Sequence, residues 1–445
     1  MRRVGDRSCV IHPVRGACCG RLDIVATMAT LQQPRRSRRE GRRAPVPNTT
    51  FSRSSLNLIP LQSRRTDPAR LRVLVVTESF LPQVNGVTNS VRRVLEHLAA
   101  EGHVAEVVAP TGPDTYAGFP VWLARGASLP FYKDFRIGLE TRRRLRSVML
   151  AFQPDVVHIA SPATLGYQAA RAAGELGIPT VAIYQTDLVG FAERYGIAGG
   201  TAAMTRLTRM IHLAVDRTLA PSTASVRQLE EMGVPGLARW PRGVDLTMFD
   251  PGFRDATLHD ELAPEGELLV GYVGRLAPEK ELGLLTHVDR LSGVRLVIVG
   301  GGPEEQRLRA LLPGAAFLGV LHGEELSRAY ATLDVFVHTG RHETYCQSAQ
   351  EALASAVPVI APRAGGPIDV VDDGAGYLYE PGSGAELASY VQRLVADLQL
   401  RARMGCQAHV SVQGRSWQAV NDRLVEHYRE VSGSATRRHR HRRAG

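Results

Sequence analysis

Short apolar runs alternate with amphipathic segments over most of the chain, which predicts βα units on parallel sheets. The first run, at 72–76, is apolar on both faces, as in a strand that helices cover from both sides. A segment with a helical period follows at 87–100. The pattern then predicts strands at 104–108, 155–159, 180–184 and 217–220, and helices at 141–152 and 163–176.

The alternation pauses near 240–265 and then starts again. In this second half the pattern predicts strands at 268–273, 294–299, 334–338 and 357–361, helices at 280–291 and 303–312, and a last amphipathic helix at 415–431. We therefore expect an α/β fold of two doubly wound halves in tandem. In such folds, ligands bind at the carboxyl ends of the strands.

Charge is concentrated at the two ends of the chain. The 445 residues carry a net charge of +10, but residues 1–70 hold 15 Arg against four acids and residues 437–445 hold five Arg and no acid. The part between them is acidic by six charges, so the composition predicts no nucleic-acid binding by the core. The ends, 1–70 and 432–445, are predicted to be disordered and basic. Met28 is an alternative start, so the leader is not assumed to belong to the native protein.

Several expected signatures are missing from the sequence. The five Cys show no paired spacing, which argues against a zinc site and favours a reducing cytoplasm. The sequence has no Gly-Lys pair of a phosphate loop, no Asp-x-Asp and no apolar run that could span a membrane. A nucleotide enzyme built from this chain is therefore expected to meet phosphate with side-chain cations and helix N-termini, without a metal.

Two segments carry candidate chemistry. Glu343 lies in a loop after a predicted strand, and Glu351 lies two turns down the helix that follows. Arg275 and Lys280 flank a strand-to-helix turn, where two cations can clamp a diphosphate, and Lys280 is one of only two lysines. The plain alternatives are that both Glu are solvated helix charges and that the cations form surface salt bridges with Glu279 or Glu281.

Taken together, the motifs resemble the retaining glycosyltransferases of family GT4, which have the GT-B fold of two Rossmann-like domains facing a cleft. The resemblance rests on Gly274-Arg275…Lys280, 242–245, 334–338, Glu343-x7-Glu351 and Gly365-Gly366-Pro367. The segments 78–90 and 184–187 are similar to those of actinobacterial GDP-mannose-dependent α-mannosyltransferases of glycolipid assembly. The resemblance implies an acceptor-binding domain at 71–245, a donor-binding domain at 246–414 and a helix at 415–431 that packs back on the first domain.

The family also implies roles for individual residues. Arg275 and Lys280 would bind the donor diphosphate, Glu343 the transferred sugar and Glu351 the ribose. Gly86 would let the backbone approach the donor. The remaining expected donor contacts are backbone groups of Tyr345, Cys346 and Gln347, and a glycine turn, Gly301 and Gly302, near the base. Many members carry His where this chain has Gln185, so a histidine-dependent step is in doubt; Gln185 could instead offer a carbonyl to the transition state.

The resemblance implies a hexosyltransferase, most specifically for mannose from GDP-mannose, with a lipid or glycolipid acceptor and no cofactor. Another donor such as UDP-glucose stays open, as does a non-catalytic protein that binds a nucleotide sugar or a nucleic acid. For the acceptor side, a basic patch contains Arg142, Arg143, Arg144 and Arg146. It either docks on anionic lipid at the inner face of the plasma membrane or is a solvated helix with one core-facing edge.

Overall fold

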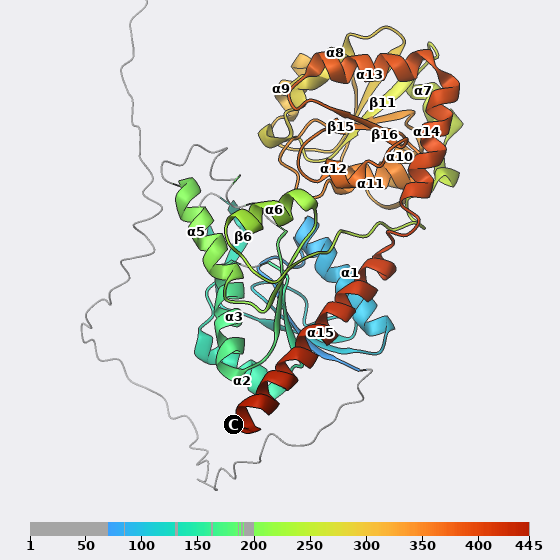
Figure 1. The fold of residues 1–445 in the computed structure, drawn as a ribbon. Helices are drawn as coiled ribbons and strands as arrows, with labels where there is room; N and C mark the ends of the chain where they lie inside the picture. Colours follow the sequence, from blue (N-terminus) through green and yellow to red (C-terminus); the bar gives the residue numbers. More distant parts are fainter. Residues whose placement is uncertain are drawn as a thin grey trace, which may run out of the picture. The chain divides into compact units, whose positions relative to one another are not determined.

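The computed structural model describes residues 70–444 apart from 84, 130–131, 162, 186, 188–189 and 191–199. The predicted leader, except for Arg70, therefore lies outside the described residues. Figure 1 shows two α/β regions that follow each other along the chain. Each is built on its own sheet, so the expected fold class of two Rossmann-like halves is confirmed.

The first half is built on an eight-stranded sheet in the order β10-β9-β8-β7-β1-β2-β4-β3. All neighbouring pairs are parallel except the edge pair of β3 and β4. Its strands are β1 (Arg72–Val76), β2 (Val104–Ala109), β3 (Thr115–Tyr116), β4 (Phe119–Leu123), β7 (Val156–Ile159), β8 (Thr180–Ile183), β9 (Arg217–Ala220) and β10 (Leu237–Arg239). The central strands β1, β7 and β8 are buried almost throughout, which explains their continuous apolar runs.

Helices join these parallel strands, as the βα pattern requires. They are α1 (Gly86–Ala100), α2 (Arg142–Phe152), α3 (Thr164–Leu176), α5 (Gly200–His212) and α6 (Thr223–Glu231). A separate antiparallel hairpin of β5 (Gly126–Leu129) and β6 (Tyr132–Gly138) precedes α2. The helix α1 begins at Asn85, whose side chain accepts hydrogen bonds from the backbone N–H groups of Val87 and Thr88.

The second half is built on a six-stranded, fully parallel sheet in the order β13-β12-β11-β14-β15-β16. Its strands are β11 (Leu268–Val273), β12 (Val294–Val299), β13 (Ala316–Gly319), β14 (Val335–Val337), β15 (Val359–Pro362) and β16 (Gly376–Tyr379). Its α-helices are α7 (Ala256–Leu262), α8 (Thr286–Asp289), α9 (Glu305–Leu311), α10 (Gly323–Thr332), α11 (Gln347–Ala354), α12 (Pro367–Val370), α13 (Gly384–Ala396) and α14 (Leu398–Ser411), with a 3-10 turn at Pro251–Phe253.

The helix expected at 280–291 is broken into three short pieces. Two 3-10 turns, Pro278–Lys280 and Leu282–Leu285, precede α8. Glu281 separates the turns with a φ of 51°, a left-handed backbone that an α-helix cannot contain. Lys280 therefore ends a tight turn instead of starting a long helix.

The last helix, α15 (Trp417–Ala444), returns to the first half of the chain. Its apolar residues Val420, Leu424 and Tyr428 belong to the same core cluster as β1 and α1. The helix runs to Ala444, so the disordered tail predicted at 432–445 is wrong for 432–444. Arg and Ala are among the best helix formers, and they let the helix continue after its apolar face ends. None of the helices within the described ranges is long and apolar enough to cross a membrane.

Candidate active site

A pocket of about 500 Å³ is lined by residues of both halves. Part of its lining follows directly after parallel strands: Glu78 and Ser79 after β1, Ser161 after β7, and Tyr184 and Gln185 after β8. From the second half, Arg275 follows β11, and Glu343 lies in the loop after β14. The pocket thus occupies the position where doubly wound folds bind ligands. Among the predicted site residues, Gly86, Gln185, Arg275, Lys280 and Glu343 line it.

Lys280 and Glu343 form an ion pair inside the pocket, and both side chains are largely buried. His338, at the end of β14, approaches the same carboxylate, with Nε2 3.2 Å from Glu343 Oε1. Burial opposes the charge on Glu343, but Lys280 and His338 hold the pKa of this carboxyl well below its usual range. Burial likewise opposes protonation of His338, yet Cys346 and Glu343 raise its pKa to about 9. Glu343 is therefore an ionised acceptor held between two cations.

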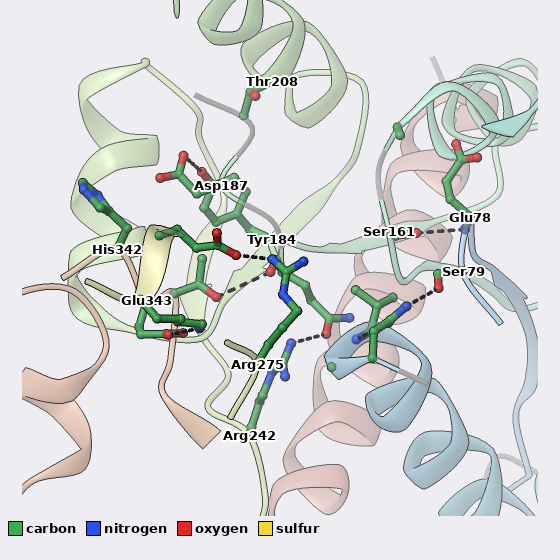
Figure 2. A pocket seen from close by; sticks show the side chains of 18 of the residues that line it. Glu78, Ser79, Ser161, Tyr184, Asp187, Thr208, Arg242, Arg275, His342 and Glu343 are labelled. Atoms are coloured by element: carbon green, nitrogen blue, oxygen red, sulfur yellow. Dashed lines mark hydrogen bonds and ion pairs between the residues drawn. The ribbon is translucent and has the colours of Figure 1, made fainter. Parts of the chain in front are cut away.

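Arg275 forms an ion pair with Glu279, four residues later, and its side chain is half exposed in the pocket. A surface salt bridge between a cation of this segment and Glu279 or Glu281 was the alternative to diphosphate binding, and Arg275 forms it. Lys280 differs, because it turns to Glu343 and not to its sequence neighbours. Figure 2 shows Arg275 in the middle of the drawn side chains, with Glu343 beside it.

The glycine turn 300–302 packs against the backbone of the loop that carries Arg275. Leu276 donates its N–H to Gly301 O at 2.9 Å. A Cβ at Gly302 would lie 2.3 Å from Leu276 O, so only glycine allows this close backbone packing. Neither Gly301 nor Gly302 lines the pocket. The structure shows these glycines shaping the loop that carries Arg275; a contact with the base stays a prediction.

Arg242 is a third cation in the pocket, which the sequence reasoning quoted in a motif without giving it a role. It donates to Gln185 Oε1 at 3.0 Å, and Gln185 Nε2 donates to Ala160 O at 2.9 Å. Both ends of the Gln185 amide are thus engaged, and its side-chain carbonyl faces Arg242. A Cβ on Gly86 would lie 2.5 Å from Arg242 Nη1, so the glycine leaves room for this guanidinium.

The segment around the start of α11 holds the other predicted donor contacts, and none of them lines the pocket. Cys346 precedes the helix with a φ of 79°, and the hydroxyl of Tyr345 donates to Gln350. Gln347 donates to Gly243 O at 3.1 Å. Glu351 Oε2 accepts from Tyr330 at 2.9 Å, and burial raises the pKa of Glu351 to about 7. The roles of these four residues in donor binding stay predictions.

Glu78 is a buried carboxylate in the part of the pocket lining that comes from the first half of the chain, which we call the first-half wall. The sequence analysis did not identify it as a site residue. It accepts from the N–H of Gly138 at 2.9 Å and from the N–H of Leu165 at the start of α3. Desolvation raises its pKa to about 7 although these N–H groups favour the charged form. In Figure 2, Glu78 and Ser161 lie on the opposite side of the view from His342 and Glu343. Glu78 thus joins the β1 loop to β6 and α3.

The four arginines of the predicted basic patch lie in or at the start of α2. Arg142 and Arg146 approach Glu175, while Arg144 approaches Glu140 and lies over the Trp122 ring. The opposite edge of α2 packs in the core through residues such as Leu145 and Met149. The helix α2 therefore has the core-facing edge that we expected if it is a solvated helix. The aromatic residues and Lys133 that precede this patch in the sequence, at 131–135, have side chains that lie outside the described residues.

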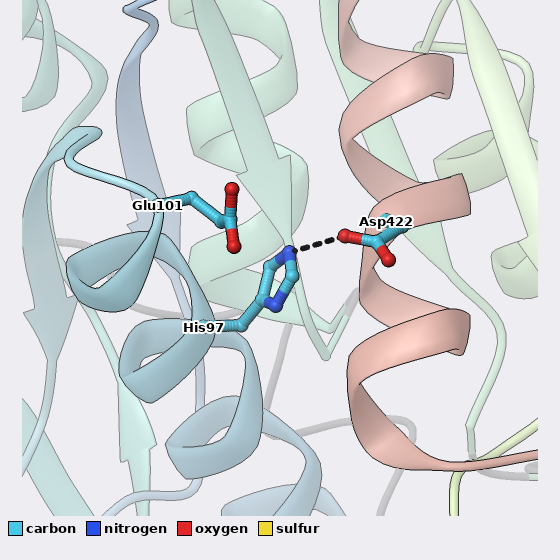
Figure 3. A group of neighbouring side chains, drawn as sticks. All are labelled: His97, Glu101 and Asp422. Carbon is cyan, nitrogen blue, oxygen red and sulfur yellow. Dashed lines mark ion pairs between the residues drawn. The ribbon is translucent and has the colours of Figure 1, made fainter.

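A second group of ionisable side chains lies where α1 meets α15 (Figure 3). His97 Nε2 is 3.3 Å from Asp422 Oδ1, and Glu101 completes a set whose ligand atoms lie within 4.8 Å of one another. Both acids are exposed, and none of the three lines the pocket. The group therefore adds nothing to the chemistry of the pocket.

Family models match both halves of the chain. Residues 84–248 match the model of Glycosyltransferase Family 4, and residues 253–410 match that of Glycosyl transferases group 1. A GDP-mannose-dependent alpha-mannosyltransferase of Mycobacterium tuberculosis is 47% identical over 82% of this chain and 98% of that protein. The protein of the same name from Corynebacterium glutamicum is 43% identical over 81% and 89%.

More distant relatives share the fold. The sulfoquinovosyl transferase SQD2 of Arabidopsis thaliana is 32% identical over 80% of this chain and 72% of that protein. Among solved structures, Anabaena HepE in complex with UDP has a TM-score of 0.64 at 17% identity, covering 80% of this chain and 99% of that one. Sucrose-phosphate synthase from Thermosynechococcus elongatus has a TM-score of 0.66 at 20% identity, covering 82% and 100%.

Proposed function

The chain belongs to glycosyltransferase family 4 and has the GT-B fold, and on this basis we propose that it transfers mannose from GDP-mannose to a membrane glycolipid with retention of configuration. Relatives that are 43–47% identical carry the name GDP-mannose-dependent alpha-mannosyltransferase. The proposal extends their donor to this chain. Other donors, such as UDP-glucose, are the competing outcome of the experiment below.

One observation carries the proposal: Arg275, Lys280 and Glu343 line a single pocket at the ends of two parallel sheets. Arg275 and Lys280 supply the positive charge that a diphosphate needs, and Glu343 supplies an ionised acceptor for sugar hydroxyls. The ammonium of Lys280 has three N–H donors, so it can hold Glu343 and a phosphate oxygen together. We therefore assign the leaving diphosphate to the cations and the transferred sugar to Glu343.

In the proposed reaction, the bond between the sugar C1 and the β-phosphate oxygen breaks, and a bond from C1 to the acceptor hydroxyl oxygen forms on the same face. The hydroxyl proton passes to the departing phosphate, so the reaction needs no protein base and tolerates Gln185. Arg275 and Lys280 stabilise the charge that grows on the phosphate. Because these cations do the work that a divalent ion does elsewhere, we propose that the enzyme needs no metal.

The remaining predicted contacts belong to the same proposal. Glu351 would accept hydrogen bonds from the ribose, and the backbone N–H groups of Tyr345, Cys346 and Gln347 would meet the sugar or phosphate. The turn at Gly301 and Gly302 would lie near the base. Gly86, at the first turn of α1, would bring backbone N–H groups close to the donor.

For the acceptor side, we propose that α2 contacts an anionic membrane surface through Arg142, Arg143, Arg144 and Arg146. The exposed Leu139, three residues before α2, and the exposed Leu150, near its C-terminal end, support such a contact. Co-sedimentation with anionic vesicles tests it. Replacing the four arginines by Gln should abolish binding, whereas unchanged binding would contradict this part of the proposal.

The decisive experiment supplies purified protein with a panel of nucleoside-diphosphate sugars and a membrane lipid extract, with products identified by mass spectrometry. We expect a hexose added to a glycolipid from GDP-mannose. Transfer from UDP-glucose alone would correct the donor. Absence of transfer from every donor would contradict the enzymatic proposal, while retained binding of a nucleotide sugar would favour a binding protein.

A further inference from the structure

The pocket contains a carboxylate for which the donor chemistry has no use. Asp187 lies on the first-half wall, just after β8, and lines the same pocket as Arg275 and Glu343. Figure 2 shows it between Tyr184 and Thr208. Glu78, Glu279 and Glu343 also line this pocket, and a further carboxylate close to a diphosphate site is unfavourable unless it serves another group, because like charges repel.

One oxygen of Asp187 is fully used by the protein. Oδ1 accepts from the N–H of Gly190 at 2.9 Å and from Nε2 of Gln228 at 3.1 Å, and the Tyr184 hydroxyl lies 3.2 Å away. Burial and the neighbouring Asp187 raise the pKa of Tyr184, which keeps this hydroxyl a donor. Gln228 lies on α6, so its hydrogen bond connects this helix to Asp187. The carboxylate is therefore held in one orientation by two groups from the segment after β8 and one from α6.

The second oxygen of Asp187 is open. Within the described ranges, Oδ2 has no hydrogen-bond partner, and the residue is only partly buried. Two other polar side chains of this wall are occupied: Glu78 by backbone N–H groups, and Gln185 by Arg242 and Ala160. A carboxylate fixed through one oxygen presents the other as a ready acceptor.

Thr208 adds an independent observation. It lies on α5, lines the pocket and is 98% buried, since only 2% of its surface is exposed. Its hydroxyl has no hydrogen-bond partner among the described residues. A buried hydroxyl usually finds a partner, so an unpartnered one in a pocket wall indicates a place for a polar ligand atom.

We propose that Asp187 Oδ2 accepts a hydrogen bond from a hydroxyl of the acceptor's head group, with Thr208 as its neighbour in the same subsite. This inference rests on the proposed function, because it assumes that the first-half wall receives the acceptor. A hydroxyl-bearing head group matches the subsite, since it can donate to a carboxylate and exchange hydrogen bonds with a threonine. A phosphate would be repelled there by Asp187.

The substitution Asp187→Asn tests the proposal with little change of shape. Its amide oxygen can still accept from Gly190 and Gln228, while its NH₂ replaces the open acceptor by a donor. We expect the acceptor KM to rise about tenfold, the scale of one hydrogen bond to a charged group, with the donor KM unchanged. Asp260→Asn, an exposed carboxylate on α7, is the matched control and should change neither constant. Equal rises in both KM values for Asp187→Asn would indicate a structural role and overturn the proposal.

A binding measurement separates this inference from the proposed function. Calorimetry with octyl β-glucoside below its micelle concentration, in the presence of GDP, should show binding to the wild type that weakens about tenfold in Asp187→Asn. GDP binding, measured alone, should be the same in both. Equal glucoside binding by the two proteins, or none by the wild type, overturns the subsite. Mg²⁺ binding that depends on Asp187 overturns it in favour of a cation. If GDP itself does not bind, the proposed function fails.

Discussion

The two walls of the pocket hold their charges in different ways. On the second-half wall, Arg275 and Lys280 are paired with the side-chain carboxylates of Glu279 and Glu343. On the first-half wall, Glu78 is held by backbone N–H groups, and Gln185 is held by the guanidinium of Arg242 and the backbone carbonyl of Ala160. Side-chain ion pairs can exchange partners when a diphosphate arrives, whereas backbone hydrogen bonds keep the shape of the sheet. One wall is thus built to respond to a charged ligand, and the other to keep its geometry.

The two walls also differ in how they affect the pKa of a buried carboxylate. Glu343 stays ionised because two cations face it, and its pKa lies well below the usual range. Glu78 has only neutral donors around it, and its pKa rises to about 7. Neutral N–H groups compensate desolvation less completely than opposite charges do. The charge of Glu343 is therefore independent of pH near neutrality, whereas that of Glu78 is not.

The largest expected effect concerns the ion pairs of the second-half wall. Lys280→Ala should lower kcat/KM by roughly 10²-fold or more, the scale of removing a preorganised electrostatic group, and Glu343→Ala should do the same. Steady-state kinetics with GDP-mannose would measure both. Arg307→Gln, an exposed cation that pairs with Glu304, is the control. Full activity of Lys280→Ala would show that the ion pair is merely structural.

The second prediction concerns Glu351, a carboxylate beside neutral donors on the donor side. Burial raises its pKa to about 7, so the folded state holds the proton more tightly than the unfolded state. Stability is therefore lost as pH rises from about 4.5 through 7. Glu351→Gln cannot ionise, and its free energy of unfolding should exceed that of the wild type by on the order of 2 kcal/mol at pH 8 but hardly at pH 5. Urea denaturation at both pH values would measure this; a constant difference would contradict it.

A smaller effect is expected for Arg242, which holds the side chain of Gln185. Arg242→Gln removes the charged donor that fixes the amide of Gln185, and kcat should fall about tenfold, with a small change in the donor KM. Gln185→Glu offers a second readout, because it replaces the amide by a carboxylate that Arg242 can still hold. Retained activity in that variant would support a positioning role for the pair. A loss confined to the donor KM in Arg242→Gln would instead place Arg242 on the diphosphate.

Gly86 should give the smallest catalytic effect. A methyl group there would meet Arg242 Nη1 at 2.5 Å, but the guanidinium is the end of a flexible side chain and can move. We expect Gly86→Ala to lower kcat/KM about threefold, less than 1 kcal/mol. The same change at Gly118, an exposed turn glycine, is a poor control because its backbone is left-handed. Gly174 on α3, where a Cβ would meet no neighbour, is the matched one.

The last prediction is an absence of effect. Because Arg275 and Lys280 meet the diphosphate in the proposed reaction, excess EDTA should leave the transfer rate unchanged. The assay should include His97→Ala, which removes the one group of possible metal ligands found within the described residues. A requirement for an added divalent ion, in either protein, would contradict metal independence.

The sequence predicted the buried strands well, for a physical reason, whereas the donor roles of the site residues stay predictions. Strands covered on both faces, such as β11 and β12, must be continuously apolar, and their bounds were found to the residue. Arg275, Lys280 and Glu343 lie in the segments that follow such strands, so their placement in one pocket followed from the topology. The edge strands β3 and β4 and the hairpin of β5 and β6 lack this constraint and were not predicted.

The residues that sequence reasoning missed act through contacts between distant segments. Arg242 meets Gln185 across 57 positions, and Glu78 meets Gly138 across 60. His338 could have been found, since it ends a buried strand five residues before Glu343. The open oxygen of Asp187 could not, because it depends on which hydrogen bonds Tyr184 and Gln228 make. Sequence spacing locates strand ends, but it does not show which polar groups remain unpaired.

The return of α15 to the first half has a consequence for the order in which the protein is made. Val420, Leu424 and Tyr428 complete the core around β1 and α1, and Trp240 donates to Val420 O at 2.9 Å. A ribosome releases these residues more than 300 positions after β1. During synthesis, the first sheet must therefore wait with one side of its core uncovered, while the second half can close around β11–β16 earlier. We therefore expect the half that is made first to complete its core last.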